Sequence, residues 1–79
     1  MNFLVRLDTI MKVKTFASIC SRYDNLTIDL QNHRYVVDAK SIMGIFSLNL
    51  MDNLKLVIHD SDSSVENFLE EIKEFIIEE

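Results

Sequence analysis

A strand pattern ends and a helical pattern begins within Asp38-Ala39-Lys40-Ser41-Ile42-Met43-Gly44-Ile45-Phe46-Ser47-Leu48-Asn49-Leu50, and the rest of the chain is best interpreted around this run. Ser41 stands where the periodicity changes. Its hydroxyl can accept a hydrogen bond from the amide of Met43 or Gly44, which predicts an N-cap for a helix that begins at Ile42. The apolar residues that follow are too many for one buried stripe on a two-turn helix. We therefore expect some of them to face solvent or a partner.

Alternating patterns flank this run on both sides. Before it, residues 26–39 alternate apolar and polar side chains on either side of Asn32-His33, which is typical of a hairpin turn. After it, residues 54–59 alternate again and are rich in β-formers, which predicts another strand.

The N-terminal third predicts a strand followed directly by a helix. Residues 2–8 alternate in the manner of a half-buried strand. The next apolar residues are spaced by three and four and share one helical face; they are Val13, Phe16, Ala17, Cys20 and Tyr23. Asp8 or Thr9 is suited to cap this helix, which leaves residues 9–12 at the join of strand and helix.

The C-terminal residues predict the strongest helix of the chain. Ser63 with Glu66 three residues later forms a capping-box pattern. One apolar stripe follows it: Val65, Phe68, Leu69, Ile72, Phe75 and Ile76. The opposite face is acidic and is expected to be solvated.

These elements occur in the order β-α-β-β-α-β-α and predict a single domain over residues 1–79. Each strand has one apolar face, and the two long helices have matching apolar stripes, so we expect a four-stranded antiparallel sheet with three helices on one face, an α+β open-faced β-sandwich. The side chains expected to face the sheet are Phe16, Cys20, Phe68, Leu69, Ile72 and Ile76.

Composition limits the classes of function. With 48% apolar and 27% charged residues, the chain matches globular domains. No signal peptide or membrane-spanning run is recognised, and the single cysteine, Cys20, is expected to be buried, so a cytoplasmic location is predicted. Residues 60–79 hold eight acids against Lys73, whereas residues 1–59 hold seven bases against five acids. No basic cluster is present, so neither nucleic-acid binding nor membrane association is expected.

Residues 40–48, Lys-Ser-Ile-Met-Gly-Ile-Phe-Ser-Leu, resemble the serine-site helix of HPr, the small phosphocarrier of the bacterial sugar phosphotransferase system. The resemblance extends over nearly the whole chain through its length, the order of its elements and its acidic last helix. It implies a four-stranded antiparallel sheet under three helices. It also implies that Met43 and Phe46, with Ile42, lie on the surface that docks protein partners.

The same resemblance is lost at the join of the first strand and helix. In HPr a histidine there carries the phosphoryl group within a Gly-x-His-x-Arg-Pro-like segment. Here the histidine position falls on Thr9 or Ile10 and the arginine position on Met11 or Lys12, without glycine or proline. The chain is therefore similar to the catabolite-repression homologue of HPr, which keeps the serine and lacks the histidine.

Ser41 has two compatible interpretations, a helix cap and a regulatory phosphorylation site. The resemblance implies the second, because the matching serine of HPr is phosphorylated by a dedicated kinase in many Gram-positive bacteria and the product helps a transcription regulator. A phosphate at an N-cap would meet free backbone amides.

The remaining residues favour no catalytic or metal site. His33 lies in the predicted turn and His59 at a strand end, both expected on the surface, and no paired histidine or cysteine spacing indicates a metal. We expect a protein that is not an enzyme and needs no cofactor. The leading hypothesis is an HPr-like regulatory or binding protein, with HPr kinase, a transcription regulator or a phosphotransferase-system protein as partner. The alternatives are a phosphocarrier with an unrecognised acceptor and a structural paralogue without phosphorylation.

Overall fold

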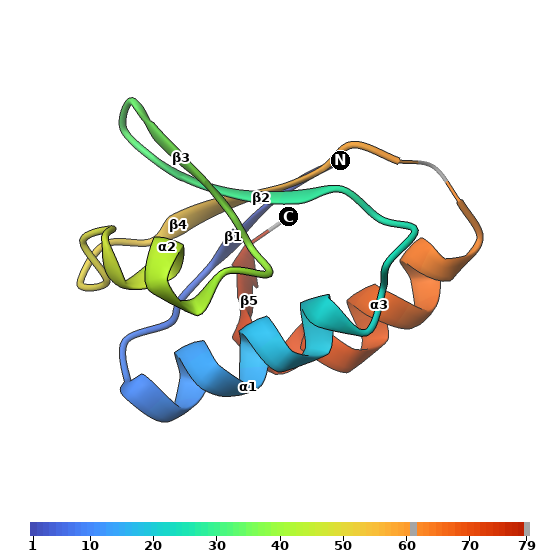
Figure 1. The fold of residues 1–79 in the computed structure, drawn as a ribbon, viewed down its shortest axis with the longest axis horizontal. Coiled ribbons are helices and arrows are strands. Elements are labelled where there is room, and N and C mark those ends of the chain that lie inside the picture. Colours follow the sequence, from blue (N-terminus) through green and yellow to red (C-terminus); the bar gives the residue numbers. More distant parts are fainter. Residues whose placement is uncertain (61, 79) are drawn as a thin grey trace.

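The computed structural model of the protein describes residues 1–60 and 62–78. Within these residues, five strands form one antiparallel sheet and three α-helices lie on one of its faces (Figure 1). The predicted α+β open-faced sandwich is therefore confirmed, with one strand more than expected. The elements are β1 (Asn2–Val5), α1 (Ile10–Ser21), β2 (Ile28–Asn32), β3 (Tyr35–Asp38), α2 (Ile42–Phe46), β4 (Leu54–Ile58), α3 (Ser64–Ile72), the 3₁₀ turn η1 (Lys73–Phe75) and β5 (Ile76–Glu78).

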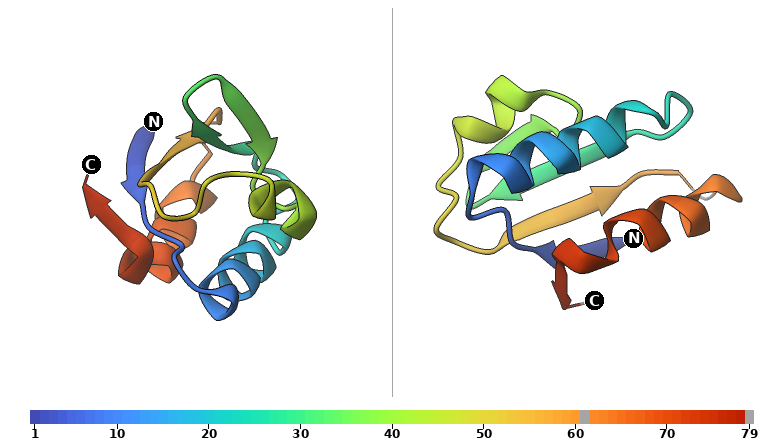
Figure 2. Two further views of the ribbon diagram at one scale, coloured as in Figure 1. Left: turned by 90° about the vertical axis from the view of Figure 1, so that its left-hand side faces the viewer. Right: turned by 90° about the horizontal axis from the view of Figure 1, so that it is seen from below.

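The strands are ordered β3-β2-β4-β1-β5 across the sheet, and α1 and α3 run side by side beneath it (Figure 2). The core lies between these two layers. Its largest fully buried side chains include Phe16, Phe68, Leu30, Leu54, Leu56 and Ile72. Burying a side chain of this kind stabilises the fold by roughly 1.5–3 kcal/mol. The predicted inward positions of Phe16, Cys20, Phe68 and Ile72 are confirmed, and Leu69 packs partly buried against them.

The C-terminal helix ends earlier than its apolar stripe predicts. It stops at Ile72, and after η1 the chain becomes β5, in which Ile76 pairs with Val5 of β1. The expectation that Ile76 lies on a helix facing the sheet is therefore wrong, and the predicted four-stranded sheet has a fifth strand. Without β5, the outer backbone groups of β1 would have no partner in the sheet, and a continued helix could not supply one. The Arg6 amide extends the pairing by donating to the Phe75 carbonyl at 3.0 Å.

The predicted capping box at Ser63 is also wrong. Ser63 already has helical backbone angles (φ −63°, ψ −22°) and makes no side-chain cap. An N-cap requires an extended backbone. Instead, the Ser64 amide donates to Asp62 Oδ1 at 2.7 Å, and this hydrogen bond is the main cause that lowers the pKa of the Asp62 carboxyl.

The hairpin turn lies one residue later than predicted. Asn32 is the last residue of β2, and its buried side chain donates to the Asn49 carbonyl at 3.4 Å. The turn is formed by His33 and Arg34, and His33 has a left-handed backbone with φ 56°. The side-chain amide of Asn32 thus links the hairpin to the segment between α2 and β4, and Asn32 belongs to the strand and not to the turn.

Among the described residues, no helix combines the length and the hydrophobicity needed to cross a membrane.

Candidate functional site

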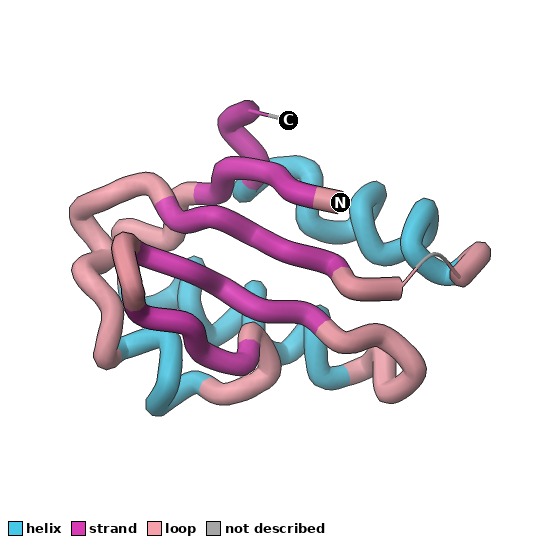
Figure 3. Tube along the Cα trace, turned by 90° about the horizontal axis from the view of Figure 1, so that it is seen from above, coloured by secondary structure: helices cyan, strands magenta, loops and turns pink. Residues whose placement is uncertain are grey.

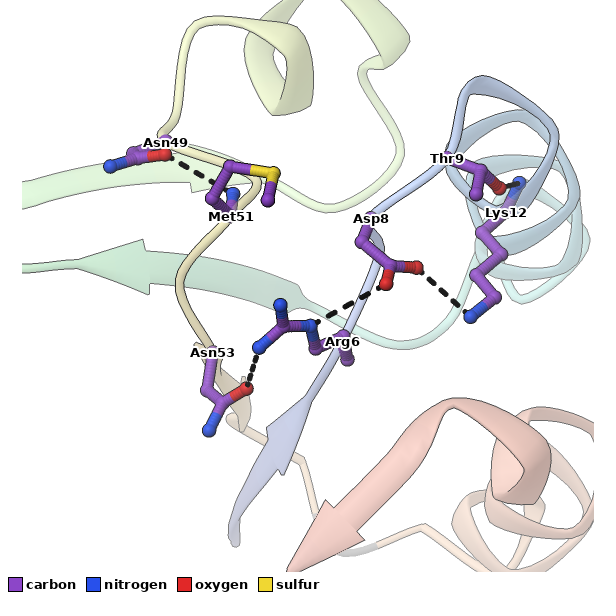
Figure 4. A network of polar contacts seen from close by, with 7 residues as sticks. All are labelled: Arg6, Asp8, Thr9, Lys12, Asn49, Met51 and Asn53. Atoms are coloured by element: carbon purple, nitrogen blue, oxygen red, sulfur yellow. Dashed lines mark hydrogen bonds and ion pairs between the residues drawn. The ribbon is translucent and has the colours of Figure 1, made fainter.

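The join of β1 and α1 is the place where the family resemblance puts a phosphoryl acceptor, and here it is built as a helix cap. Thr9 has an extended backbone (φ −134°, ψ 156°), and its Oγ1 accepts from the Lys12 amide at 3.1 Å (Figure 4). The Thr9 carbonyl accepts from the Val13 amide at 3.1 Å. Thr9 is thus committed to starting α1, as its sequence position predicts.

The charged groups around Thr9 are already paired with one another. Lys12 Nζ donates to Asp8 Oδ1 at 2.9 Å, and Arg6 Nε lies 3.6 Å from Asp8 Oδ2 (Figure 4). The hydrogen bond from Lys12 holds the pKa of the Asp8 carboxyl below its usual value, so Asp8 is an anion near neutral pH. Arg6 also donates to Asn53 Oδ1 at 3.1 Å. A negative charge, balanced by two cations, therefore stands beside the start of α1.

The first turn of α1 presents apolar side chains to solvent. Ile10 is 63% exposed and Met11 69% exposed. Ile10, one of the two positions that correspond to the histidine of HPr, is a surface side chain without a titratable group. The other, Thr9, has its oxygen turned back to the helix backbone.

Ser41 caps α2 in the way its sequence position predicts. Its backbone is extended (φ −101°, ψ 108°), and Oγ accepts from the Gly44 amide at 3.0 Å. There is little room for a side chain at residue 44, because a Cβ there would lie 3.2 Å from Ser41 Oγ and 3.3 Å from Val37 Cβ. Ser41 itself is half-buried.

Two charged residues, Asp38 and Lys40, stand close to Ser41 in the sequence. Lys40 Nζ donates to the carbonyls of Tyr23 at 2.9 Å and Leu26 at 2.7 Å. These two hydrogen bonds hold the segment between α1 and β2 against Lys40. Asp38 Oδ1 accepts from the Lys40 amide at 2.8 Å. The Lys40 ammonium is thus already engaged by backbone carbonyls.

The start of α1, α2 and the α2–β4 loop lie at the same end of the molecule (Figure 2, left), and each of them carries exposed apolar side chains. We call this set the apolar patch: Ile10, Met11, Ile42, Met43, Phe46 and Met51. Met43 is 80% exposed, Ile42 39% and Phe46 38%, whereas Ile45 of the same helix is fully buried. The sequence predicts Ile42, Met43 and Phe46 as partner-binding residues; the structure places them in one exposed region, and their role stays a prediction.

The sequence does not predict a binding role for three members of the patch, Ile10, Met11 and Met51. Ile10 and Met11 stand at positions to which the resemblance assigns histidine and arginine, and Met51 lies in a turn in which its amide donates to Asn49 Oδ1 at 3.1 Å. One feature of the sequence indicates their exposure: each is an apolar residue that lies outside the spacings that predict buried helix or strand faces.

Cys20 and the two histidines lie apart from the two helix starts. Burial raises the pKa of the Cys20 thiol to about 12, so this sulfur stays protonated. His33 Nε2 lies 3.6 Å from Asp52 Oδ2, and His59 Nε2 lies 2.7 Å from Asp29 Oδ2. Within residues 1–60 and 62–78, no group of three or more His, Cys, Asp or Glu side chains is arranged to hold a metal ion.

Comparison with known proteins places the chain in a family. A family model described as the PTS HPr component phosphorylation site matches residues 12–78. The match includes α2 with Ser41 and begins after Thr9 and Ile10. A search of curated proteins finds no match. Because the matched residues make up most of the chain and fold into the expected sandwich, the protein belongs to the HPr family of the phosphotransferase system.

Proposed function

We propose that this HPr-family protein is a regulatory binding protein and not a phosphocarrier. The family consists of phosphocarriers that interact with other proteins of the phosphotransferase system. The proposed departure from that role makes the chain similar to the histidine-lacking catabolite-repression homologue. It is a non-enzymatic, cytoplasmic role that needs no cofactor.

The observation that carries the proposal is the chemistry at the start of α1. A carrier needs an acceptor that can pass the phosphoryl group on, as an imidazole nitrogen does. Thr9 offers a hydroxyl, whose phosphate ester has a low transfer potential, and this hydroxyl already accepts the Lys12 amide. The two histidines of the sequence, His33 and His59, belong to the hairpin and to the end of β4.

The apolar patch supports binding to a protein partner. A cluster that contains three methionines and a phenylalanine adapts to different partners, because methionine is flexible and polarisable. Aromatic and methionine side chains are enriched in protein interfaces. The partner classes that fit are other phosphotransferase-system proteins, a transcription regulator and an HPr kinase.

Ser41 is the proposed regulatory residue within this surface. It immediately precedes Ile42 and Met43, so a phosphate on its oxygen would lie at the edge of the patch. Phosphorylation adds about 1.5 to 2 negative charges. Because Lys40 is engaged by two carbonyls, the added charge would act on the docking partner more than on the fold.

The first experiment tests the loss of the carrier role. The protein is incubated with enzyme I and phosphoenolpyruvate, alongside an HPr that contains the histidine, and phosphate is located by mass spectrometry. We expect the control to be phosphorylated and this protein to remain unmodified. An acid-labile phosphate on any residue would refute the proposal in favour of a carrier with another acceptor.

The second experiment tests the regulatory role. Binding of purified HPr kinase and purified phosphotransferase-system proteins is compared for the wild type, Ser41→Ala, Ser41→Asp and Phe46→Ala. Ile77→Ala serves as the matched control, since Ile77 is 50% exposed on β5 at the far edge of the sheet. We expect Phe46→Ala to abolish binding, Ser41→Asp to change partner preference and Ile77→Ala to have no effect. Identical binding by all variants would show that Ser41 is only a cap.

A further inference from the structure

The outer edge of β3 is an unpaired strand edge. β3 ends the sheet on the side of β2 (Figure 3). The Ala39 amide donates to the Ile28 carbonyl, and hydrogen-bonded pairs alternate along an antiparallel ladder, so Tyr35 and Val37 direct their backbone groups to β2. Val36 therefore directs its N–H and C=O away from the sheet. Among residues 1–60 and 62–78, no other element donates to or accepts from Val36.

This edge is short and carries charges at its ends, but it exposes two large side chains. Tyr35 is 66% exposed and Val36 55% exposed. Proteins normally guard such an edge with proline, a bulge or a covering loop, because its free backbone groups are a template for another strand. Neither proline nor a bulge is present in residues 34–38, which read Arg-Tyr-Val-Val-Asp.

The charges on the edge are self-complementary. Arg34 and Asp38 stand two residues before and two residues after Val36. In an antiparallel pair of identical strands centred on Val36, Arg34 of each copy lies opposite Asp38 of the other. The side chains of residues 34, 36 and 38 alternate onto the same face, the open face of the sheet, so the opposite charges would meet there.

Neither charge forms an ion pair within residues 1–60 and 62–78, although Asp38 accepts a hydrogen bond from the Lys40 amide. Among the described residues, Arg34 forms no ion pair or side-chain hydrogen bond. Asp38 stands directly opposite Asp29 in the β2–β3 register. Like charges in directly opposed positions destabilise a sheet, so a cation on the other side of Asp38 would relieve this contact.

We propose that a second copy of this chain binds along β3, with the two β3 strands antiparallel and Val36 on the two-fold axis. Each Val36 exchanges both backbone hydrogen bonds with Val36 of the other copy, and two Arg34–Asp38 pairs flank this centre. The two sheets then form one continuous sheet with both helical layers on the same side. A strand this short buries less area than the roughly 1,200–2,000 Å² of a stable interface, so the dimer forms at high protein concentration.

Sedimentation equilibrium over a range of protein concentrations tests this proposal by charge reversal. Arg34→Asp makes both flanking positions acidic, and Asp38→Arg makes both basic. We expect each variant alone to dimerise at least about tenfold more weakly than the wild type, and an equal mixture of the two to recover association. Lys14→Asp is the matched control, since Lys14 is exposed on α1 and its replacement changes the net charge as Arg34→Asp does.

Val36→Pro provides an independent test that involves no charge. Because the Val36 amide points to solvent, proline at this edge position should leave the fold intact, as circular dichroism would verify, and should abolish dimerisation. A wild type that remains monomeric at all concentrations would overturn the proposal. So would a dimer that Val36→Pro and Arg34→Asp leave unchanged, because another surface would then hold the copies together.

Discussion

The start of α1 and the start of α2 are nearly the same in local geometry and differ in their surroundings. In both, an extended residue with a hydroxyl accepts from the amide three residues later, at 3.1 Å for Thr9 and 3.0 Å for Ser41. α1 then continues for 12 residues and buries four of them, whereas α2 has 5 residues and buries only Ile45. α1 is therefore held by its cap and by four buried side chains, whereas α2 is held by its cap and one buried side chain, that of Ile45.

The difference shows that a cap alone does not make a functional site. At Thr9, paired charges from Arg6, Asp8 and Lys12 enclose the helix start. At Ser41, the absence of a side chain on Gly44 leaves the hydroxyl room, and exposed Ile42 and Met43 follow directly. The family match includes the second start and begins after the first cap residue.

The largest expected effect comes from removing the anchor of α2. Ile45→Ala deletes a fully buried side chain and should lower the free energy of unfolding by about 2–5 kcal/mol. Ile42→Ala, on the exposed side of the same helix, should cost less than about 1 kcal/mol. Urea denaturation of both variants measures the difference. Equal losses would contradict the assignment of Ile45 as the single anchor.

The two caps provide the next comparison. Ser41→Ala and Thr9→Ala should each lower stability by about 1 kcal/mol. The location of the loss should differ, because α1 is also held by its buried side chains. Amide hydrogen exchange should therefore accelerate throughout α2 in Ser41→Ala, but only at the Lys12 amide and its neighbours in Thr9→Ala. If exchange accelerates to the same extent throughout both helices, the proposed difference in how α1 and α2 are stabilised is wrong.

The charges at Thr9 predict a pH dependence. The pKa of Asp8 is lowered in the folded state, mainly by the hydrogen bond from Lys12, so its stabilising contribution is present above the unfolded pKa of about 3.9 and is lost as pH falls through the lowered folded value. Asp8→Asn should lower stability at pH 6 and have progressively less effect on further acidification. Urea midpoints between pH 2 and pH 6 measure this. Added salt should shrink the effect, since the pair is exposed.

The smallest expected effect is that of Gly44→Ala. Alanine favours the helix by roughly 0.5–1 kcal/mol, and its Cβ would crowd Ser41 Oγ at 3.2 Å. We expect these effects to offset each other to within about 1 kcal/mol. Gly44→Val should be clearly less stable than Gly44→Ala, because it adds bulk against Val37. Thermal unfolding of the two variants would measure the order, and the reverse order would show that residue 44 has more room than the backbone geometry indicates.

Local periodicity by itself determined four strands, three helices and most of the buried side chains. Thr9 and Ser41 could be recognised as caps because an N-cap depends only on a hydroxyl and the next few amides. The buried faces of α1 and α3 followed from the spacing of apolar residues, which reflects a single helical period. The same locality explains why some apolar residues of α2 could be expected on the surface, since a short helix cannot bury all of them, whereas the resemblance to HPr singled out Met43 and Phe46.

Tertiary structure alone decided the features that depend on distant partners. Ile76 continues a helical stripe in the sequence, yet it lies in β5 because β1 has a free edge for it to pair with. Asp62 rather than the neighbouring Ser63 caps α3, because Ser63 is already helical. The apolar patch exists because the chain returns α2 and Met51 to the end of the sheet where Ile10 and Met11 begin α1. The β1–β5 pairing and the return of α2 to the start of α1 join residues tens of positions apart, so no local pattern in the sequence encodes them.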